Sequence, residues 1–212
     1  MTLSKTVIVD YGLGNLRSVA SAIIEVGGTP EVTAEPELIQ RAERIILPGV
    51  GAFGVAAQHL ETSGIGSALL AASSQGVPLL GICLGMQLLF SRGNEFGWSS
   101  GLALIPGDVL PIVDQDNAGD LRGTHIGWRS LSLSPLQQNH PLWAGITRED
   151  FFYFVHSFSA EAVHTSNVLA TVPYGLKELV VAVTEGNVIG VQFHPEKSGR
   201  PGLRVLENFI NQ

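Results

Sequence analysis

A cysteine and a histidine–glutamate pair are the residues of this sequence whose setting best fits catalysis. Cys83 lies in the segment 81–85, Gly-Ile-Cys-Leu-Gly, between an apolar strand pattern over residues 77–82 and a helical pattern over 84–90. A sharp strand-to-helix turn holds a nucleophile in a strained conformation, and it needs small neighbours. The start of a helix also favours a thiolate. We therefore predict that Cys83 is a nucleophile, although a lone cysteine is often only a small buried apolar residue.

Among the six histidines of the sequence, His194 has the setting of a catalytic base. It follows a strand pattern over residues 188–193 and precedes Pro195, which ends the strand, and Glu196. Residues two apart in an extended chain point to the same side, so His194 and Glu196 can reach one site together. A carboxylate beside an imidazole fixes its tautomer and supports its charged form. The pattern predicts a Cys-His-Glu triad; the alternative is a strand-end histidine near a surface carboxylate.

A glycine-containing loop is the candidate for a second oxyanion donor. The segment 47–51, Leu-Pro-Gly-Val-Gly, follows a buried strand pattern, and its glycines allow backbone amides to face a ligand. The first free amide of the next helix, that of Leu84, is the other donor expected. Strand ends converge at the carboxyl edge of a parallel sheet, so we expect the loop to lie beside Cys83. A Pro-Gly-x-Gly segment alone is usually only a turn.

The elements that must position these residues alternate in the first half of the chain. Strand patterns cover residues 6–10, 31–33, 44–47 and 78–83. Helical patterns cover residues 15–26 and 54–74, the second broken around Gly64 and Gly66. Such alternation predicts an α/β fold with a mostly parallel central sheet and helices on both faces.

The second half contains short strand patterns separated by turn residues. They cover residues 107–113, 130–133, 151–155, 168–172, 179–183 and 188–193, and a helix is predicted over 202–210. The turn 185–187, Glu-Gly-Asn, predicts a hairpin. No linker or internal repeat interrupts the chain, so we predict one domain over residues 1–212, with these strands as an antiparallel extension.

Composition excludes several classes of protein. Hydrophobic residues make up 45% of the 212 residues and charged residues 15%, which is typical of a globular enzyme. The net charge of −7 argues against nucleic acid as a partner. No apolar run has transmembrane length and no secretory signal is evident, so the cytoplasm is the expected compartment. The single cysteine excludes an internal disulfide and a cysteine-cluster metal site.

These motifs, in this order, resemble those of the class I, triad-type glutamine amidotransferases, whose fold is flavodoxin-like. That family has a Pro-Gly-x-Gly loop, then Gly-x-Cys-x-Gly, then a strand that ends in His-Pro-Glu. Within it, the chain is most similar to the glutaminase subunits of imidazole glycerol phosphate synthase. The segments that carry this narrower resemblance are residues 10–16, 49–53, 81–89, 125–128, 153–157 and 190–198.

The resemblance implies a reaction and a role for each matching position. Cys83 would attack the side-chain amide of L-glutamine, giving a glutamyl thioester and ammonia. His194 would transfer the protons and Glu196 would orient it. The oxyanion hole would be formed by the amides of Val50 or Gly51 with Leu84, and glutamine's α-carboxylate and α-amino groups would be held by Gln87 and Glu95. No cofactor and no metal ion is expected.

The resemblance also implies a partner, because ammonia that escapes into water is lost. We expect a heterodimer with a (βα)₈-barrel cyclase, which uses the ammonia to make imidazole glycerol phosphate and aminoimidazole carboxamide ribotide in histidine biosynthesis. The positions that match the interface are Asn15, Trp128, Tyr153 and Lys197, although the two aromatic residues could equally be core. If the Gly49-Val50-Gly51 peptide can turn over, cyclase binding could complete the oxyanion hole.

Two positions depart from the family pattern, and three other readings remain open. Thr124 and Arg129 stand where the family usually has proline and asparagine, which affects the local loop and any interface contact of Arg129. Another class member, such as a pyridoxal-phosphate-synthase glutaminase or a γ-glutamyl hydrolase, would not need the 125–128 and 153–157 segments. A scaffold with a redox-sensing cysteine would not need His194 and Glu196. A cysteine protease would need a peptide groove.

Overall fold

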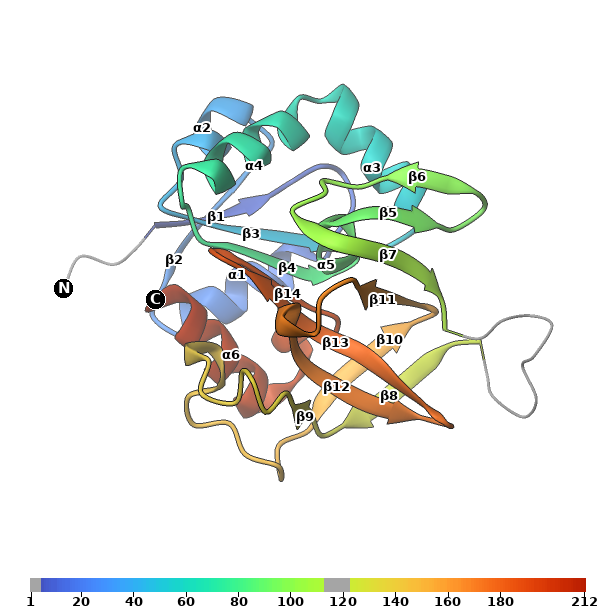
Figure 1. Cartoon of the computed structure of the whole chain (residues 1–212). Coiled ribbons are helices and arrows are strands. Elements are labelled where there is room, and N and C mark those ends of the chain that lie inside the picture. Colours follow the sequence, from blue (N-terminus) through green and yellow to red (C-terminus); the bar gives the residue numbers. More distant parts are fainter. Residues whose placement is uncertain (1–4, 113–122) are drawn as a thin grey trace.

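A large mixed sheet forms the centre of the molecule in the computed structural model, which describes residues 5–112 and 123–212. The 12-stranded sheet has the strand order β2-β1-β3-β4-β14-β13-β11-β7-β5-β6, and off this path β12 pairs with β13 and β9 pairs with β12 (Figure 1). A separate two-stranded sheet is formed by β8 and β10. Among the described residues, no helix combines the length and the apolar character needed to cross a membrane.

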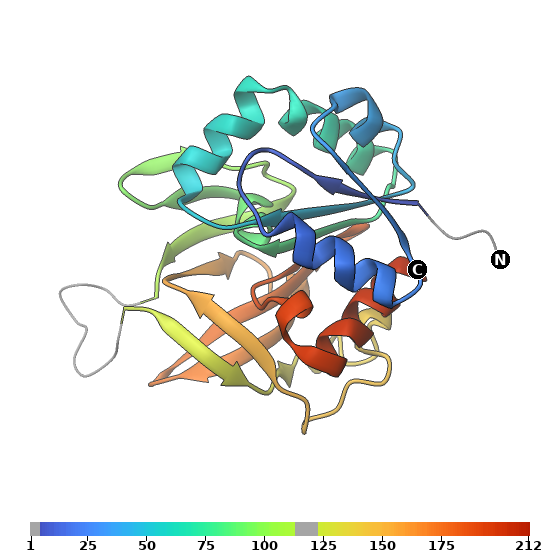
Figure 2. The same cartoon turned by 180° about the vertical axis from the view of Figure 1, so that it is seen from behind.

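The first half of the chain builds the parallel part of the sheet. Its elements are β1 (Lys5–Val9), α1 (Leu16–Glu25), β2 (Thr29–Thr33), α2 (Pro36–Gln40), β3 (Arg44–Gly49), α3 (Phe53–Thr62), α4 (Ile65–Ser74), β4 (Leu79–Cys83) and α5 (Leu84–Leu88). Strands β1, β2, β3 and β4 pair in parallel. Apolar side chains of these strands alternate between two core clusters, one on each face of the sheet. Helices cover both faces: α2, α3 and α4 on one side, α1 and the C-terminal α6 on the other (Figures 1 and 2).

The second half adds mostly antiparallel strands. Its elements are β5 (Phe90–Asn94), β6 (Trp98–Ser100), β7 (Ile105–Pro111), β8 (His125–Arg129), β9 (Ser132–Leu133), β10 (Phe152–His156), β11 (Phe158–Ala162), β12 (Val168–Tyr174), β13 (Lys177–Glu185), β14 (Val188–Val191), α6 (Gly199–Ile210) and the short 3₁₀ turns η1 (Pro141–Trp143), η2 (Thr165–Asn167) and η3 (Pro195–Lys197). Strand β14 pairs in parallel with β4 and antiparallel with β13. The extension therefore joins the parallel sheet through β14.

The predicted fold class is confirmed, including the hairpin between β13 and β14 and the break before α4. At that break Gly64 has φ 78°, in the left-handed region that favours glycine. The predicted strand over 107–113 is observed from Ile105 to Pro111, and its last residue, Val113, lies outside the described residues.

Several elements differ locally from the prediction. The helix predicted over 84–90 ends at Leu88, because Phe90 already belongs to β5. Strands β5, β6, β8 and β11 and the short helix α2 were not predicted. β5, β6 and β8 contain glycine or several polar residues, so they lack the run of apolar residues that marks a strand, and their pairing depends on partners distant in the sequence.

Candidate active site

Cys83 stands at a strained turn between β4 and α5. Its backbone has φ 56° and ψ −113°, an unusual conformation for a residue other than glycine. The flanking glycines are required by close packing: a Cβ added at Gly81 would lie 2.7 Å from the carbonyl oxygen of Gly85. A Cβ at Gly85 would lie 1.8 Å from the carbonyl oxygen of Leu47. The predicted turn and its small neighbours are therefore present, and the thiol is free and almost fully buried.

The glycine loop lies beside Cys83, as predicted. Strands β3 and β4 pair so that Gly49 is opposite Cys83. Beyond it, Val50 is 42% exposed. A cavity of about 400 Å³ opens here. It is lined by Val50, Gly51, Cys83, Leu84, Gln87, Glu95, Thr124, Val155, His156, Ser157, Phe158 and His194. The structure thus brings the nucleophile, its histidine and all the predicted oxyanion and glutamine-binding residues to one cavity.

His194 and Glu196 form a buried pair behind the nucleophile. Because β14 pairs in parallel with β4, the chain that leaves β14 arrives at the same sheet edge as Cys83. The Nδ1 atom of His194 lies 2.8 Å from Oε1 of Glu196, and their side chains are 3% and 1% exposed. The backbone amide of His194 donates to the carbonyl oxygen of Tyr153, and Ser198 Oγ donates to the His194 carbonyl oxygen at 2.6 Å. Bonds on both backbone groups hold the imidazole's position.

The charge state of His194 follows from its neighbours. Burial lowers the pKa of His194, but hydrogen bonding and charge from Cys83 and from Glu196 outweigh burial and raise this pKa from 6.5 to about 9. His194 Nε2 is buried and bonds to no other described residue in ordinary geometry, so Cys83 is the neighbour left to interact with it. At neutral pH the imidazole therefore carries its proton beside the sulfur. This arrangement favours a thiolate–imidazolium pair, the reactive form of a cysteine nucleophile.

The raised pKa predicts the alkaline side of the pH profile. A departing ammonia needs the proton of His194, so kcat/KM for glutamine should fall about tenfold per pH unit above the pKa of about 9. Initial rates at pH values on both sides of 9 test this. Glu196→Gln removes one of the interactions that raise the pKa, so the falling limb should move to lower pH. If the alkaline limb of the kcat/KM profile does not move in this variant, the assignment of that limb to His194 is wrong.

The side chains of Gln87 and Glu95 line the cavity, and both are held by hydrogen bonds to other residues. Nε2 of Gln87 donates to Oε1 of Gln192 at 2.9 Å and to the carbonyl oxygen of Phe158 at 3.2 Å. With both amide hydrogens engaged, Gln87 keeps its Oε1 acceptor for a ligand. Glu95 Oε2 accepts, at 2.6 Å, from the backbone amide of Phe53, which is the first residue of α3. Glu95 is therefore a fixed carboxylate rather than a freely solvated one.

Several residues of the site were missed in the sequence. The cavity wall includes His156 and Ser157, which the motif 153–157 contains but to which no role was given. Ser157 Oγ lies 2.7 Å from Oγ1 of Thr124, so the threonine makes a contact that proline could not. His156 Nε2 lies 2.9 Å from Nδ1 of His125, and burial lowers the pKa of each to about 4. This second histidine pair is neutral, which distinguishes it from His194.

The predicted interface residues lie at the surface near the triad. Trp128 and Tyr153 are opposite each other in the β8–β10 pair, with ring centroids 5.7 Å apart. Trp128 is 49% exposed and Tyr153 is partly exposed, so neither is a core residue. Asn15 and Lys197 are exposed, and the Asn15 side chain makes no capping bond to α1. Arg129 is also exposed and donates to the Trp128 carbonyl oxygen at 2.9 Å.

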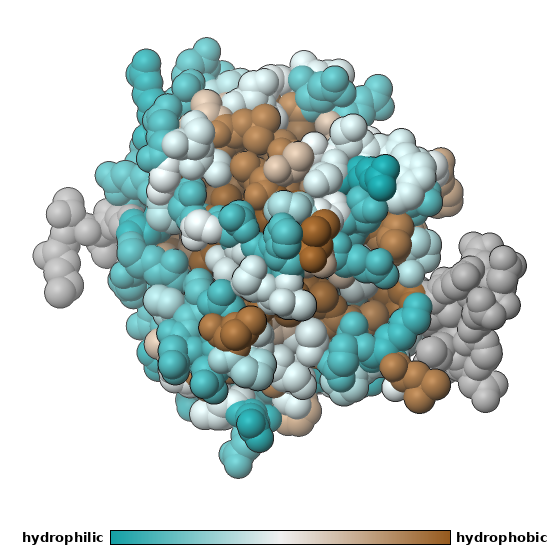
Figure 3. All heavy atoms as spheres, in the orientation of Figure 1, coloured by the Kyte–Doolittle hydropathy of each residue, from teal (hydrophilic) through white to brown (hydrophobic). Residues whose placement is uncertain are grey.

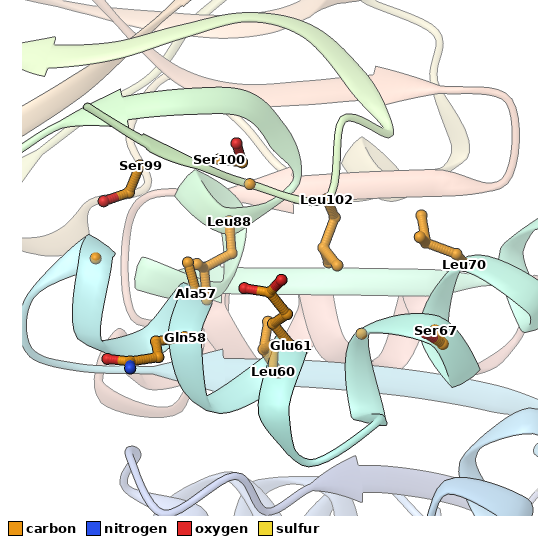
Figure 4. Close-up of a pocket in the computed structure, with 13 residues that line it drawn as sticks. Ala57, Gln58, Leu60, Glu61, Ser67, Leu70, Leu88, Ser99, Ser100 and Leu102 are labelled. Atoms are coloured by element: carbon orange, nitrogen blue, oxygen red, sulfur yellow. The ribbon is translucent and has the colours of Figure 1, made fainter.

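A larger groove of about 640 Å³ lies elsewhere, between α3, α4 and the segment from β6 to Leu102 (Figure 4). Hydrophobic residues are visible at the surface over this part of the molecule, in the upper half of the space-filling view (Figure 3). The described residues that line it include no cysteine, histidine or lysine, and its one acidic group is Glu61. Size therefore does not mark the active site; the smaller cavity holds the reactive groups.

Comparison with known proteins agrees with this geometry. The sequence model of the family described as glutamine amidotransferase class-I matches residues 7–212. The imidazole glycerol phosphate synthase subunit HisH of Methanosarcina barkeri is 43% identical over 210 residues, covering 99% of both chains. The chain is a class-I glutamine amidotransferase of the HisH type. The HisH subunit of Moorella thermoacetica is 45% identical over 202 residues, covering 95% of this chain and 92% of that one.

The HisH-type amidotransferase shares its fold with more distant solved structures. The structure of PurLQS from Thermotoga maritima aligns with a TM-score of 0.75 and 21% identity, covering 99% of both chains. A structure titled as that of a glutamine amidotransferase aligns with a TM-score of 0.72 and 20% identity, covering 97% of this chain and 99% of that one. The resemblance inferred from the motifs is thus confirmed for family and fold.

Proposed function

We propose that this HisH-type chain hydrolyses L-glutamine at Cys83 and supplies the ammonia to a cyclase subunit in histidine biosynthesis. The observation that carries the proposal is the buried His194–Glu196 pair behind a free cysteine at a strained turn. A redox-sensing cysteine has no need of such a pair. The HisH relatives also favour this reading over other amidotransferases.

The reaction follows from the positions of the groups. The Cys83 sulfur attacks the amide carbon of glutamine, and the resulting oxyanion is held by the amides of Leu84 and of the Val50–Gly51 loop. The carbon–nitrogen bond breaks as His194 gives its proton to the departing ammonia, leaving a glutamyl thioester. Water then attacks the thioester, His194 takes a proton from it, and glutamate leaves as the sulfur returns to its starting state.

Substrate orientation depends on the two tied groups. Oε1 of Gln87 and the Glu95 carboxylate are acceptors, so both suit the α-ammonium group of glutamine. The family resemblance instead assigned the two residues to different groups of the substrate, the α-carboxylate and the α-amino group. The α-carboxylate then needs donors from elsewhere in the wall, where the Thr124 and Ser157 hydroxyl groups lie.

The glycine loop supports a switch in the oxyanion hole, with unequal parts for its two glycines. A Cβ added at Gly49 would lie 2.2 Å from the Tyr11 hydroxyl and 3.1 Å from Leu84 Cβ, so this end of the loop is closely packed. Gly51 has φ 108° and nothing within 4 Å of an added Cβ. The space around Gly51 and its freedom as a glycine favour rotation of the peptide at the Val50–Gly51 end rather than at Gly49.

The partner that we propose is a (βα)₈-barrel cyclase, docked over Trp128, Tyr153, Asn15 and Lys197. Half-exposed aromatic side chains are typical interface anchors. The carbonyl oxygen of Tyr153 accepts from the backbone amide of His194. A partner that contacts Tyr153 is therefore one hydrogen bond away from the segment that carries the triad. We place the reaction in the cytoplasm, where a free catalytic thiol remains reduced.

Glutamine hydrolysis by the chain alone, with cyclase, and with cyclase plus its nucleotide ligand tests this proposal. We expect kcat to rise by about 10² to 10³ from the first to the third condition, the cost of one missing oxyanion donor. Gly51→Ala, which restricts the loop, should reduce this rise. Equal rates in all three conditions would contradict the switch, and absence of hydrolysis in all three would contradict the function itself.

A further inference from the structure

Gln192 is a fully buried side chain beside the nucleophile that the reaction above does not use. It is 0% exposed, and its Nε2 donates to the Cys83 sulfur at 3.6 Å. Its Oε1 accepts from Gln87 Nε2 at 2.9 Å. Gln87 also donates from Nε2 to the Phe158 carbonyl oxygen, which can only accept. Gln87 must therefore present its amide hydrogens to Gln192, and Gln192 must turn its own NH₂ group toward the sulfur.

We propose that Gln192 is a catalytic residue of this site, which stabilises the Cys83 thiolate and holds Gln87 for the substrate. The inference rests on the proposed glutaminase function and adds a second donor to the sulfur. A hydrogen bond to an anionic acceptor is stronger than one to its neutral form. The Gln192 amide therefore stabilises the thiolate more than the thiol. An amide does not ionise, so this donor is present at every working pH.

The position of Gln192 argues against a packing role alone. Its neighbours Val191 and Phe193 are fully buried in the apolar core on the α1–α6 side of the sheet, whereas Gly190 and Gln192 alternate to the other side. That side is also apolar: an added Cβ at Gly190 would meet Met86. An apolar residue at 192 would avoid the cost of burying an amide, which is large unless the amide is hydrogen-bonded. Its partners here are the nucleophile and a predicted substrate residue.

Other titratable groups near the Cys83 sulfur could also change its ionisation. His194, bonded to Glu196, is the charged group that faces Cys83, and His156 lies beyond it with a lowered pKa. On the other side, burial and then the charge of Cys83 raise the pKa of Tyr11, which therefore stays neutral. None of these groups is changed by substitution of Gln192. A shift in thiol ionisation on substitution can then be assigned to the lost N–H donor.

The test is the pH dependence of Cys83 alkylation by iodoacetamide in the full chain. The sequence has one cysteine, so the alkylation rate reports this sulfur alone. In Gln192→Met we expect the midpoint of the rate profile to rise by about one pH unit, a tenfold loss of thiolate below it. KM for glutamine should rise as well, because Gln87 loses one of the two acceptors that hold its amide and keeps only the Phe158 carbonyl oxygen. Gln137→Met, at a partly exposed glutamine outside the site, should change neither value.

The melting temperature shows whether a variant is folded, and the midpoint of the alkylation profile shows whether its thiol ionisation has changed. If Gln192→Met does not fold, Gln192→Asn keeps the amide but withdraws it from the sulfur, and it should raise the midpoint in the same direction. A folded variant with an unchanged midpoint overturns the inference. This holds also if its melting temperature is lower, because a change in stability alone means that Gln192 has only a structural role. Alkylation needs no glutamine, so this failure would leave the proposed hydrolysis, tested by turnover itself, unaffected.

Discussion

Cys83→Ser is expected to lower kcat for glutamine hydrolysis by about 10⁴ to 10⁶, the range seen when one member of a catalytic triad is removed. The serine hydroxyl occupies nearly the same space, but its proton is held far too tightly for it to form an anion beside His194. The loss should appear in kcat both with and without the cyclase. Because Cys83 is buried and its backbone is unchanged, the melting temperature should stay close to that of the parent chain.

The triad predicts an order among three variants. Glu196→Gln keeps the shape of the side chain but removes the charge that supports protonated His194, so its loss should be smaller, about 10² to 10⁴. Glu207→Gln is the matched control, because the Glu207 side chain is 40% exposed and pairs with Arg204 within α6, outside the cavity. It should keep full activity. Turnover by Cys83→Ser within tenfold of the parent chain would show that this cysteine is not the nucleophile.

Gly85→Ala is expected to give the largest loss of stability. Its Cβ would lie 1.8 Å from the Leu47 carbonyl oxygen and 2.8 Å from the Leu47 carbonyl carbon, so α5 and β3 would have to separate. Alanine gains about 1 kcal/mol over glycine in helix propensity. The backbone clash outweighs this gain, and we expect a net loss of at least ~3 kcal/mol. For a chain of this size the melting temperature should then fall by about 6 to 12 °C.

The control for this prediction is Gly123→Ala. An added Cβ at Gly123 meets none of the described residues within 4 Å, so the change should be nearly neutral, within about 0.5 kcal/mol. Thermal unfolding of both variants, followed by circular dichroism, gives the comparison. If Gly85→Ala melted with the parent chain, the close approach of α5 to β3 would not be a requirement of the turn.

Local patterns in the sequence were sufficient for the elements that build the parallel sheet. Short apolar runs, each followed by glycine or by a helical pattern, predicted β1, β3 and β4 and the turn at Cys83. The same reasoning could not find β5 or β8, because their residues are partly polar and their stability comes from pairing with β7 and β10. It also extended the helix after Cys83 into β5, since Leu89 and Phe90 continue the apolar pattern.

The candidate site divides in the same way. The sequence by itself determined the groups that do the chemistry: Cys83 between two glycines, and His194 two residues before Glu196, because these depend on residue type and short spacing. Only the tertiary structure decided which distant groups surround the sulfur. Gln192 looks in the sequence like one polar residue in an apolar strand, and its contact with Cys83 exists because β14 pairs with β4. That pairing joins segments more than a hundred residues apart, a relationship that no local pattern contains.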